Sequence, residues 1–461
     1  MTEPNRLPRP DAAPSASAML IVYVLLVAGA SGNWGFLSWW GVALLVAAAA
    51  FIVYFQLRPD RPTPPAEAML AGVLVGSVAV HLLLSAGQHQ EIVRLAASTR
   101  LTWPGILIKV LTALALIGAC AYLLPAAGLR GRFGALVALA VFMRILMVFS
   151  SPIPQIDVFV SQTCAGRGLL DGWNIYGMEG MPSPYVEGQT FWHFAYPPLV
   201  VYCNSLSWLL FKDVRGLWIL CDLATAGLIY LLARRTRPES RIFAELTALV
   251  FLFMPRSLFV IEQSWTEPLV TVTMAAFALA VAAGRGPLVT GAAFGLWLSS
   301  KQYVVLALPL VARLRRLPLR AWGVAVALGA LIALPFMIWN LEGVLNNLVI
   351  FFLKSDARAD SNSVFGLVYA LTGQQIPWAV VLLFWIGALA WFTWRMPRNL
   401  PGMLFSTAGL WLFFFLMGKQ AFMNYFHLIA CTLLLAVAAT TDDRPLVRYG
   451  APSGTGDGGR G

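Results

Sequence analysis

Hydrophobic segments alternate with short polar stretches along almost the whole chain. The apolar runs approach about 20 residues, the length of a helix that crosses the hydrocarbon core of a bilayer. They lack the short alternating segments that mark a membrane β-barrel. The pattern therefore predicts an all-α polytopic membrane protein with about 13–14 transmembrane helices. The candidate helices are 18–31, 35–57, 68–86, 104–124, 134–151, 217–233, 242–260, 266–283, 287–300, 302–313, 320–340, 377–395, 399–417 and 421–439.

A long polar segment interrupts this pattern after the fifth candidate helix. Residues 152–216 are rich in Gly, Pro and aromatic residues and contain acids, amides and a histidine. A loop of this length without a repeat is usually functional. Asp157 follows directly on the fifth helix, where the loop leaves the membrane. We therefore expect 152–216 to be the catalytic loop and Asp157 to be its reactive carboxylate, although an aspartate there could also cap a helix.

Basic residues gather between the helices and set the expected orientation. Their clusters are Arg6/Arg9, Arg58/Arg61, Arg130/Arg132, Arg234/Arg235/Arg237, Arg313/Arg315/Arg316 and Arg395/Arg398. Such clusters mark the cytoplasmic side of a membrane protein. All of them lie on that side only if the short apolar run 200–211 lies in the outer interface and does not cross the membrane. We predict a multi-pass cell-membrane protein with both termini in the cytoplasm and the loop facing the periplasm or exterior. The preference for arginine over lysine is typical of a GC-rich bacterial genome.

Composition narrows the class of protein. The chain is 59% hydrophobic and 11% charged, which excludes a soluble globular protein. Its net charge of +11 is carried by the clusters between helices, so we interpret it as a topology signal facing anionic lipid rather than a nucleic-acid surface. No P-loop or Gly-rich dinucleotide fingerprint is present, and no cysteines or histidines have metal-ligand spacing.

These observations divide the chain into four parts. Residues 1–17 form a cytoplasmic tail, and 18–133 carry four transmembrane helices of unknown role. The catalytic transmembrane domain is 134–440, with 152–216 as its loop, and 441–461 form a flexible cytoplasmic tail. We expect the first apolar run to be retained as a helix and not cleaved as a secretory signal.

Cationic residues are expected on the same outer face as Asp157. Lys301 separates two apolar runs too short for a comfortable crossing, which predicts a hairpin of half-depth helices with an unpaired ammonium at its tip. Lys419 lies at the outer end of another helix, and either lysine could instead snorkel to the headgroups. A carboxylate beside cations suits transfer from a lipid phosphate, because the carboxylate acts as general base and the cation stabilises the departing phosphate. Arg256 and His427 are further candidates for that phosphate.

The loop sequence also resembles a known family. QIDVFVSQTCAGRGLLDGWNIYG, SPY and FAYPPL, followed by LWILCDLATAGLIYLLARR, look like the catalytic subunit of glycosylphosphatidylinositol mannosyltransferase I and bacterial polyprenol-phosphate-mannose-dependent mannosyltransferases of the GT-C fold. The resemblance continues at MPRSLFVIEQSWTEP, GLWLSSKQYVVLALPL and GKQAFMNYFHL, and covers roughly 145–435. It implies a GT-C fold, a dolichyl- or polyprenyl-phosphate-mannose donor, inversion at the anomeric carbon and an active site outside the cytoplasm. Eukaryotic relatives need a partner subunit, and that need stays open here.

The resemblance also suggests roles for individual residues. Asp157 falls on the catalytic acid, but the Asp-x-Asp of the family becomes Gln155-Ile156-Asp157, so a divalent metal would lose a ligand and metal dependence stays open. No other cofactor is expected. The residues proposed to bind substrate are Glu267, Tyr196, His193, Arg358 and Asn362. Tyr196 could instead shape the turn before Pro197 and Pro198, and His193 and His427 could be structural.

The leading hypothesis is an integral membrane glycosyltransferase that transfers mannose from polyprenyl-phosphate-mannose to an extracytoplasmic lipid-linked or glycan acceptor. One alternative uses the same fold with another polyprenyl-phosphate sugar, such as arabinose. Another is a lipid or sugar-lipid transporter, which inverted repeats or several intramembrane acids would favour. The sequence shows no such repeats. The expected partners are the donor, the acceptor and membrane lipids, with no nucleic acid.

Overall fold

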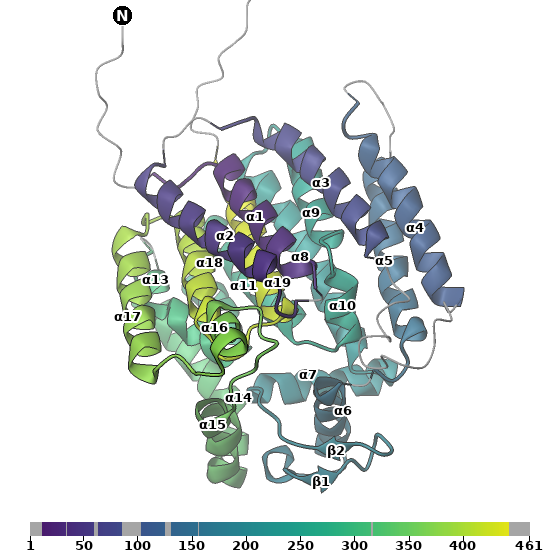
Figure 1. The fold of residues 1–461 in the computed structure, drawn as a ribbon, viewed down its shortest axis with the longest axis vertical. Helices are drawn as coiled ribbons and strands as arrows, with labels where there is room; N and C mark the ends of the chain where they lie inside the picture. The colour runs from purple at the N-terminus through teal and green to yellow at the C-terminus, as the bar shows by residue number, and fades with distance from the viewer. Residues whose placement is uncertain are drawn as a thin grey trace, which may run out of the picture.

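The computed structural model describes residues 12–33, 35–59, 63–84, 103–124, 131–154, 156–314 and 317–441. Most of the two predicted tails, together with Gln155, Arg315 and Arg316, lie outside these ranges. The described chain is a helical bundle with one short two-stranded sheet (Figure 1). The bundle begins with α1 (Ala16–Ser31), α2 (Trp39–Leu57), α3 (Ala66–Leu83), α4 (Trp103–Cys120) and α5 (Arg132–Ser150).

The predicted loop is largely helical. It contains α6 (Asp157–Leu170), η2 (Ile175–Gly177), the antiparallel pair β1 (Met181–Pro182) and β2 (Thr190–Phe191), and α7 (Pro198–Phe211). The sequence pattern did not predict α6, because its helix-forming residues are mixed with polar ones and form no apolar run. α7 lies beside α6 at the foot of the bundle in Figure 1, at the end that we call the loop end.

The second half completes the bundle. Its elements are α8 (Arg215–Thr236), α9 (Arg241–Leu252), α10 (Ser257–Glu262), α11 (Glu267–Ala282), α12 (Pro287–Leu298), η3 (Gln302–Ala307), α13 (Leu308–Ala312), α14 (Leu319–Leu345), η4 (Asn346–Ile350), α15 (Phe351–Lys354), α16 (Val364–Thr372), α17 (Trp378–Arg395), α18 (Leu400–Leu416) and α19 (Met423–Ala438). The predicted helix 242–260 is wrong as a single span. It breaks between α9 and α10, where Arg256 has a φ of 67°.

The fold is that of an all-α membrane protein. Within the described ranges, seven helices are long and apolar enough to cross a bilayer: α2, α3, α4, α5, α8, α17 and the helical segment 319–354, which has a kink at Asn340. The other apolar helices are shorter, at 10–17 residues. Length and composition thus identify seven candidate crossings within the described ranges, and the crossing of the shorter helices stays a prediction.

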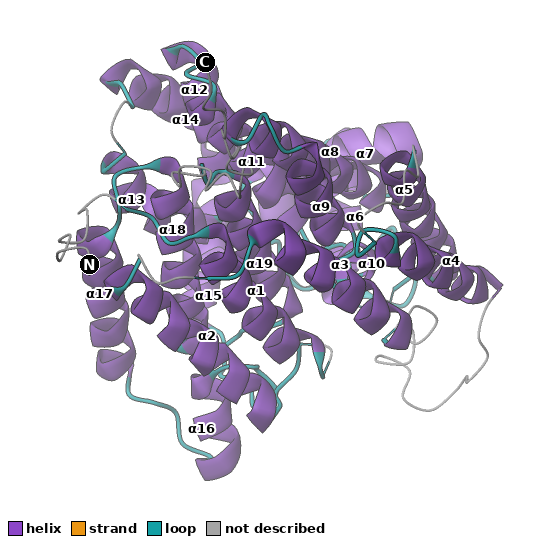
Figure 2. Ribbon diagram, turned by 90° about the horizontal axis from the view of Figure 1, so that it is seen from above, coloured by secondary structure: helices purple, strands orange, loops and turns teal. Residues whose placement is uncertain are grey.

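The apolar core is centred on α19. Every residue of this helix except Tyr425 is buried. In Figure 2, α19 lies in the middle of the bundle with α1, α9, α11 and α18 around it. A helix that is apolar on all sides is buried in a protein core or in a bilayer, and α19 occupies the core position.

Hydrogen bonds show which helix ends lie together. The Thr236 hydroxyl at the end of α8 donates to the Ala438 carbonyl at 2.6 Å, and Arg235 donates to the Ala282 carbonyl at 2.9 Å. Helices α8, α11 and α19 therefore end side by side. We call this the arginine end of the bundle, and it lies opposite the loop end (Figure 1). The Arg234/Arg235/Arg237 cluster lies at this end, and its cytoplasmic orientation stays a prediction.

The region around Lys301 forms a hairpin. Two glycines of α12 pack closely against the backbone of α14. A Cβ atom added at Gly291 would lie 2.5 Å from the Ala321 carbonyl oxygen, and one added at Gly295 would lie 2.8 Å from the Ala325 carbonyl oxygen. Because the contacts advance together along both helices, α12 and α14 run parallel. The chain between them must therefore return through η3 and α13. Lys301, with extended φ and ψ of −162° and 149°, lies at the turn, as the two short apolar runs predicted.

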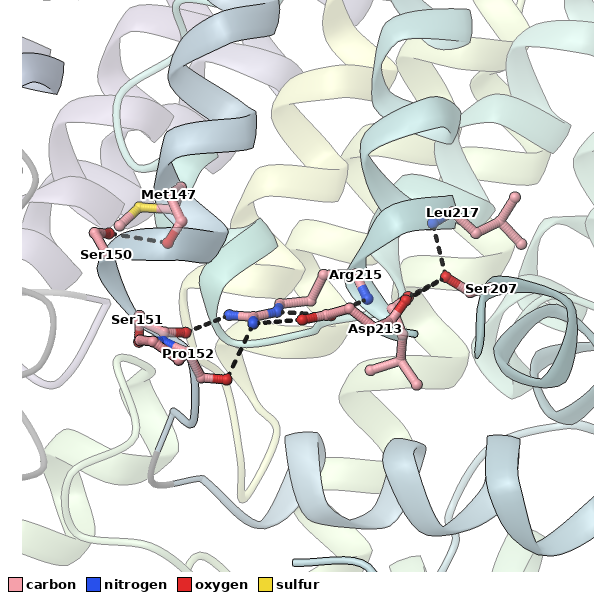
Figure 3. Close-up of polar contacts among 9 residues, drawn as sticks. Met147, Ser150, Ser151, Pro152, Ser207, Asp213, Arg215 and Leu217 are labelled. Atoms are coloured by element: carbon pink, nitrogen blue, oxygen red, sulfur yellow. Dashed lines mark hydrogen bonds and ion pairs between the residues drawn. The ribbon is translucent and has the colours of Figure 1, made fainter. Parts of the chain in front are cut away.

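One arginine joins the two ends of the loop. Arg215 is fully buried and donates to the carbonyls of Ser151 at 2.6 Å and Pro152 at 3.2 Å, while its guanidinium pairs with Asp213 at 2.6 Å (Figure 3). The Ser207 hydroxyl of α7 also holds the backbone of Asp213, because it donates to the Asp213 carbonyl at 2.7 Å. We call this group the neck of the loop. It fixes where α5 ends and α8 begins.

Candidate functional site

Asp157 is the first residue of α6 and is exposed at the loop end. Its carboxylate accepts a hydrogen bond from the Val158 backbone N–H at 2.9 Å. The carboxylate thus lies at the N-terminal end of a helix, where the helix dipole attracts negative charge. The N-cap is Ile156, so Asp157 is not the capping residue. The carboxylate is accessible, as a general base must be.

His193 lies next to Asp157. Its carbonyl accepts from the Ser161 hydroxyl of α6 at 3.1 Å, and its ring packs on Phe351 with centroids 3.7 Å apart. Burial lowers the pKa of His193, and the negative charges of Asp157 and Glu179 oppose that shift. The structure thus brings two predicted site residues, His193 and Asp157, into electrostatic contact.

Tyr196 is under the electrostatic influence of both Asp157 and the buried acid Glu267. Burial is the main cause that raises the pKa of the Tyr196 phenol, and the charges of Glu267 and Asp157 raise it further. Its carbonyl accepts from the Tyr176 hydroxyl at 2.7 Å, which fixes the turn before Pro197. Tyr196 therefore has the turn-shaping contact considered from the sequence and also faces the candidate site.

Lys301 and Glu267 form a buried ion pair. The ammonium donates to a Glu267 carboxylate oxygen at 2.8 Å and to the Thr266 hydroxyl at 2.8 Å. The side chains of Lys301 and Glu267 are 7% and 0% exposed. The expectation of an unpaired ammonium is wrong, because the start of α11 supplies its counter-ion. Two of its three N–H donors are engaged, and the third has no partner within the described ranges.

Aromatic rings and the loop enclose this ion pair. The Lys301 ammonium lies 5.0 Å from the ring centroid of Tyr196, 5.7 Å from that of Tyr303 and 6.0 Å from that of Tyr425. Such contacts stabilise a cation that has lost its water. The Gln302 amide donates to the Ala195 carbonyl at 2.9 Å, so the tip of the hairpin is fastened to the turn of the loop.

A strained segment delivers Thr266 and Glu267. Ser264, just before them, has a φ of 58°, which is unusual for a residue with a side chain and is typical of functional sites. The amide of Gln162 in α6 donates to the Ser264 carbonyl and accepts from the Trp218 indole N–H at 3.0 Å. Gln162 therefore links α6, which carries Asp157, to the start of α11. The sequence analysis missed this residue; its only signal was an amide within the loop.

Two helices begin at the ion pair. Glu267 is the first residue of α11, and Asn424 in the first turn of α19 donates to its carboxylate at 3.0 Å. The free N–H groups at helix N-termini attract anions. The predicted site thus combines one ammonium with two positive helix ends.

The other predicted phosphate ligands lie apart from this group. Arg256 is buried and donates to the Ser31 carbonyl at 3.2 Å, and burial lowers its pKa to about 10. Lys419 donates to the Ser355 carbonyl at 3.1 Å. Both cations therefore hold backbone segments together.

Arg358 and Asn362 also have structural contacts. Arg358 is exposed and pairs with Asp360 at 2.5 Å. Asn362 is 1% exposed, and its amide donates to the Gly29 carbonyl at 3.2 Å and accepts from the Ser38 N–H. Asn362 thereby fastens the α1–α2 turn to the loop end, so the structure gives it a structural role instead of a place beside Tyr196.

His427 lies deeper in the bundle, on α19. It is 1% exposed, and neither ring nitrogen has a hydrogen-bond partner within the described ranges. Asp222, Glu267 and Arg144 are its charged neighbours. Asp222 is itself paired with Arg144 at 2.5 Å, so the second acid inside the bundle is neutralised.

Metal ligands do not gather around Asp157. Among the described residues, no three His, Cys, Asp or Glu side chains come together to hold a metal ion, and Gln155 is outside those residues.

Known proteins add no further constraint on this site. No family model matches the chain, and no curated protein is significantly similar to it. The function is therefore inferred from the site itself.

Proposed function

We propose that this protein is a GT-C-type integral membrane glycosyltransferase that transfers mannose from polyprenyl-phosphate-mannose to an extracytoplasmic lipid-linked or glycan acceptor. The observation that carries the proposal is the meeting of the loop with the Lys301 hairpin: Tyr196 lies 5.0 Å from the ammonium and within the electrostatic reach of Asp157. An exposed carboxylate and a buried cation thus face one aromatic residue between them.

The charges suit a phosphate leaving group. The third N–H of Lys301 and the N-termini of α11 and α19 all offer positive charge to a donor phosphate. The lipid tail of the donor would remain in the bilayer beside the apolar helices. A nucleotide pocket is therefore unnecessary, in agreement with the absence of nucleotide motifs from the sequence.

The reaction balances with these groups. The acceptor hydroxyl oxygen attacks the anomeric carbon and forms the new glycosidic bond, while the Asp157 carboxylate takes the hydroxyl proton. The bond from the anomeric carbon to the phosphate oxygen breaks, and polyprenyl phosphate leaves with the electron pair. Lys301 stabilises the additional negative charge on that phosphate. A single displacement of this kind inverts the anomeric carbon.

The transporter alternative also has support from the structure. A half-depth hairpin with a charged tip and buried acids is a feature of transport proteins. Three of the four buried acids among the described residues, Asp222, Glu245 and Glu267, are paired with cations, however, which leaves them poorly suited to carry a coupled ion. We therefore prefer the transferase.

Reconstitution distinguishes the three possibilities. Purified protein in lipid vesicles is incubated with radiolabelled polyprenyl-phosphate-mannose, or the arabinose analogue, together with membrane lipids. The transferase forms a labelled covalent product, and the preferred sugar is the one transferred faster. A transporter moves intact donor between leaflets without a new product. Product formation that is lost in Asp157→Asn and retained in Glu245→Gln supports the proposal, because Glu245 is a buried acid bound to Tyr122 and Arg241.

A further inference from the structure

One oxygen of the Glu267 carboxylate is saturated, and the other is not. Oε1 accepts from Lys301 at 2.8 Å, Asn424 at 3.0 Å and Tyr303 at 3.3 Å. Oε2 has no hydrogen-bond partner within the described ranges, although Glu267 is fully buried. A buried acceptor without a partner is costly and calls for an explanation.

His427 is a second buried side chain whose polar atoms lack hydrogen-bond partners within the described ranges. Both of its ring nitrogens lack a partner within the described part of the chain, and Glu267 is one of its charged neighbours. His427 follows Asn424 by three residues on α19, so the two side chains share a helix face. Asn424 already reaches Glu267 from that face. His427 therefore lies on the face of α19 that reaches Glu267, with Asp222 and Arg144 as its other charged neighbours.

A hydroxyl group satisfies both residues at once. It donates its proton to the carboxylate oxygen and accepts the N–H of a neutral imidazole, which carries one donor and one acceptor. A free anion fits poorly beside Oε2, because the carboxylate would repel it and the Lys301 ammonium bonds the other oxygen. Two sources of a hydroxyl are available: a sugar ring and a buried water molecule.

We propose that Glu267 Oε2 and the His427 ring bind one ring hydroxyl of the sugar being transferred, and so select sugars that carry it. This inference rests on the proposed function. Lys301 connects the Glu267 carboxylate with the donor phosphate. Its ammonium contacts Glu267 at 2.8 Å, and its third N–H is available to the phosphate. The sugar is bonded directly to that phosphate, so its hydroxyls reach the region beside Lys301. His427, first expected to contact the phosphate, becomes a sugar ligand.

Deoxy donors test the inference. Wild-type protein is assayed with polyprenyl-phosphate-mannose and with its 2-, 3-, 4- and 6-deoxy analogues, and kcat/KM is measured for each. A site built to bond a hydroxyl rejects the analogue that lacks it by about 10²–10⁴-fold, so one position should stand out. In Glu267→Gln and His427→Phe, the ratio of kcat/KM for the native donor to kcat/KM for that one deoxy analogue should fall below about ten-fold. The corresponding ratios for the other deoxy analogues should stay as they are in the wild type.

Tyr303→Phe is the matched control. Tyr303 bonds Oε1 and not Oε2, so this variant should lower kcat/KM for every donor by a common factor. His427→Phe keeps the ring shape and decides the question by itself if Glu267→Gln fails to fold.

The outcomes separate the two proposals. Unchanged deoxy ratios in both variants would assign the unpaired atoms to buried water and overturn this inference alone. Absence of transfer from every native donor by the wild type would overturn the proposed function, and the inference with it.

Discussion

Lys301 and Glu267 stabilise each other as a buried ion pair and are also proposed to bind the substrate. Substituting the two residues singly and together separates the effect on stability from the effect on activity. Lys301→Met leaves the Glu267 charge buried, although Asn424 and Tyr303 still donate to it at 3.0 Å and 3.3 Å. Breaking one side of a buried ion pair costs about 3–5 kcal/mol. Because those two neutral donors remain, we expect the lower value of about 3 kcal/mol. Replacing both charges by neutral groups of similar volume should restore stability to within about 1 kcal/mol of the wild type.

The assay compares Lys301→Met, Glu267→Gln and the double variant. Unfolding free energies are measured by denaturant titration in mixed micelles, and transfer rates are measured in vesicles with polyprenyl-phosphate-mannose. We expect the double variant to recover stability and not activity, because the phosphate loses its ammonium, a loss worth about 2–4 kcal/mol of transition-state stabilisation. Recovery of the transfer rate together with stability would refute the reasoning, since Lys301 would then serve only as the counter-ion of Glu267.

Three further predictions concern the role of Asp157, the pH dependence of stability and the orientation in the membrane. Asp157→Asn should lower kcat by about 10²–10⁴-fold with the donor KM little changed; near-normal turnover would move the base to Glu267. Because burial depresses the pKa of His193, the folded state binds fewer protons than the unfolded one, so stability should fall as pH drops below the ordinary value of 6.5. A smaller pH dependence in His193→Asn, measured by the same denaturant titration at each pH, would confirm this. Impermeant thiol reagents should label a cysteine at exposed Gly188 from outside and one at exposed Glu239 only from inside; the reverse would overturn the orientation.

The positions of helices were well predicted because long apolar runs leave few alternatives in a membrane. α5, α8 and α17 begin and end within a few residues of the predicted ranges. The hairpin at Lys301 was predicted from the shortness of its two runs. α6 was missed, since its residues pack against the loop and α7 rather than against lipid and so carry no strong apolar signal.

The contacts of the candidate site were less predictable. The separation of Glu267 and Lys301 is 34 residues, and no helix period connects them, so only the packing of α11 against the hairpin makes them partners. Arg144 was also overlooked, although a charge inside an apolar run marks a candidate for function by default. The structure shows that it balances Asp222 within the bundle, at 1% and 2% exposure.

The neck formed by Arg215 has a consequence for how this chain can change. The loop leaves and re-enters the bundle at one place, because Arg215 bonds Ser151, Pro152 and Asp213 together. The cost of closing a longer loop grows only slowly with its length. The β1–β2 hairpin between α6 and α7 can therefore be lengthened or shortened without moving α5 or α8, while Ala195 and Tyr196 keep their contacts with Gln302 and Lys301. Acceptor preference could diversify by such changes while the helices that hold Lys301 stay the same.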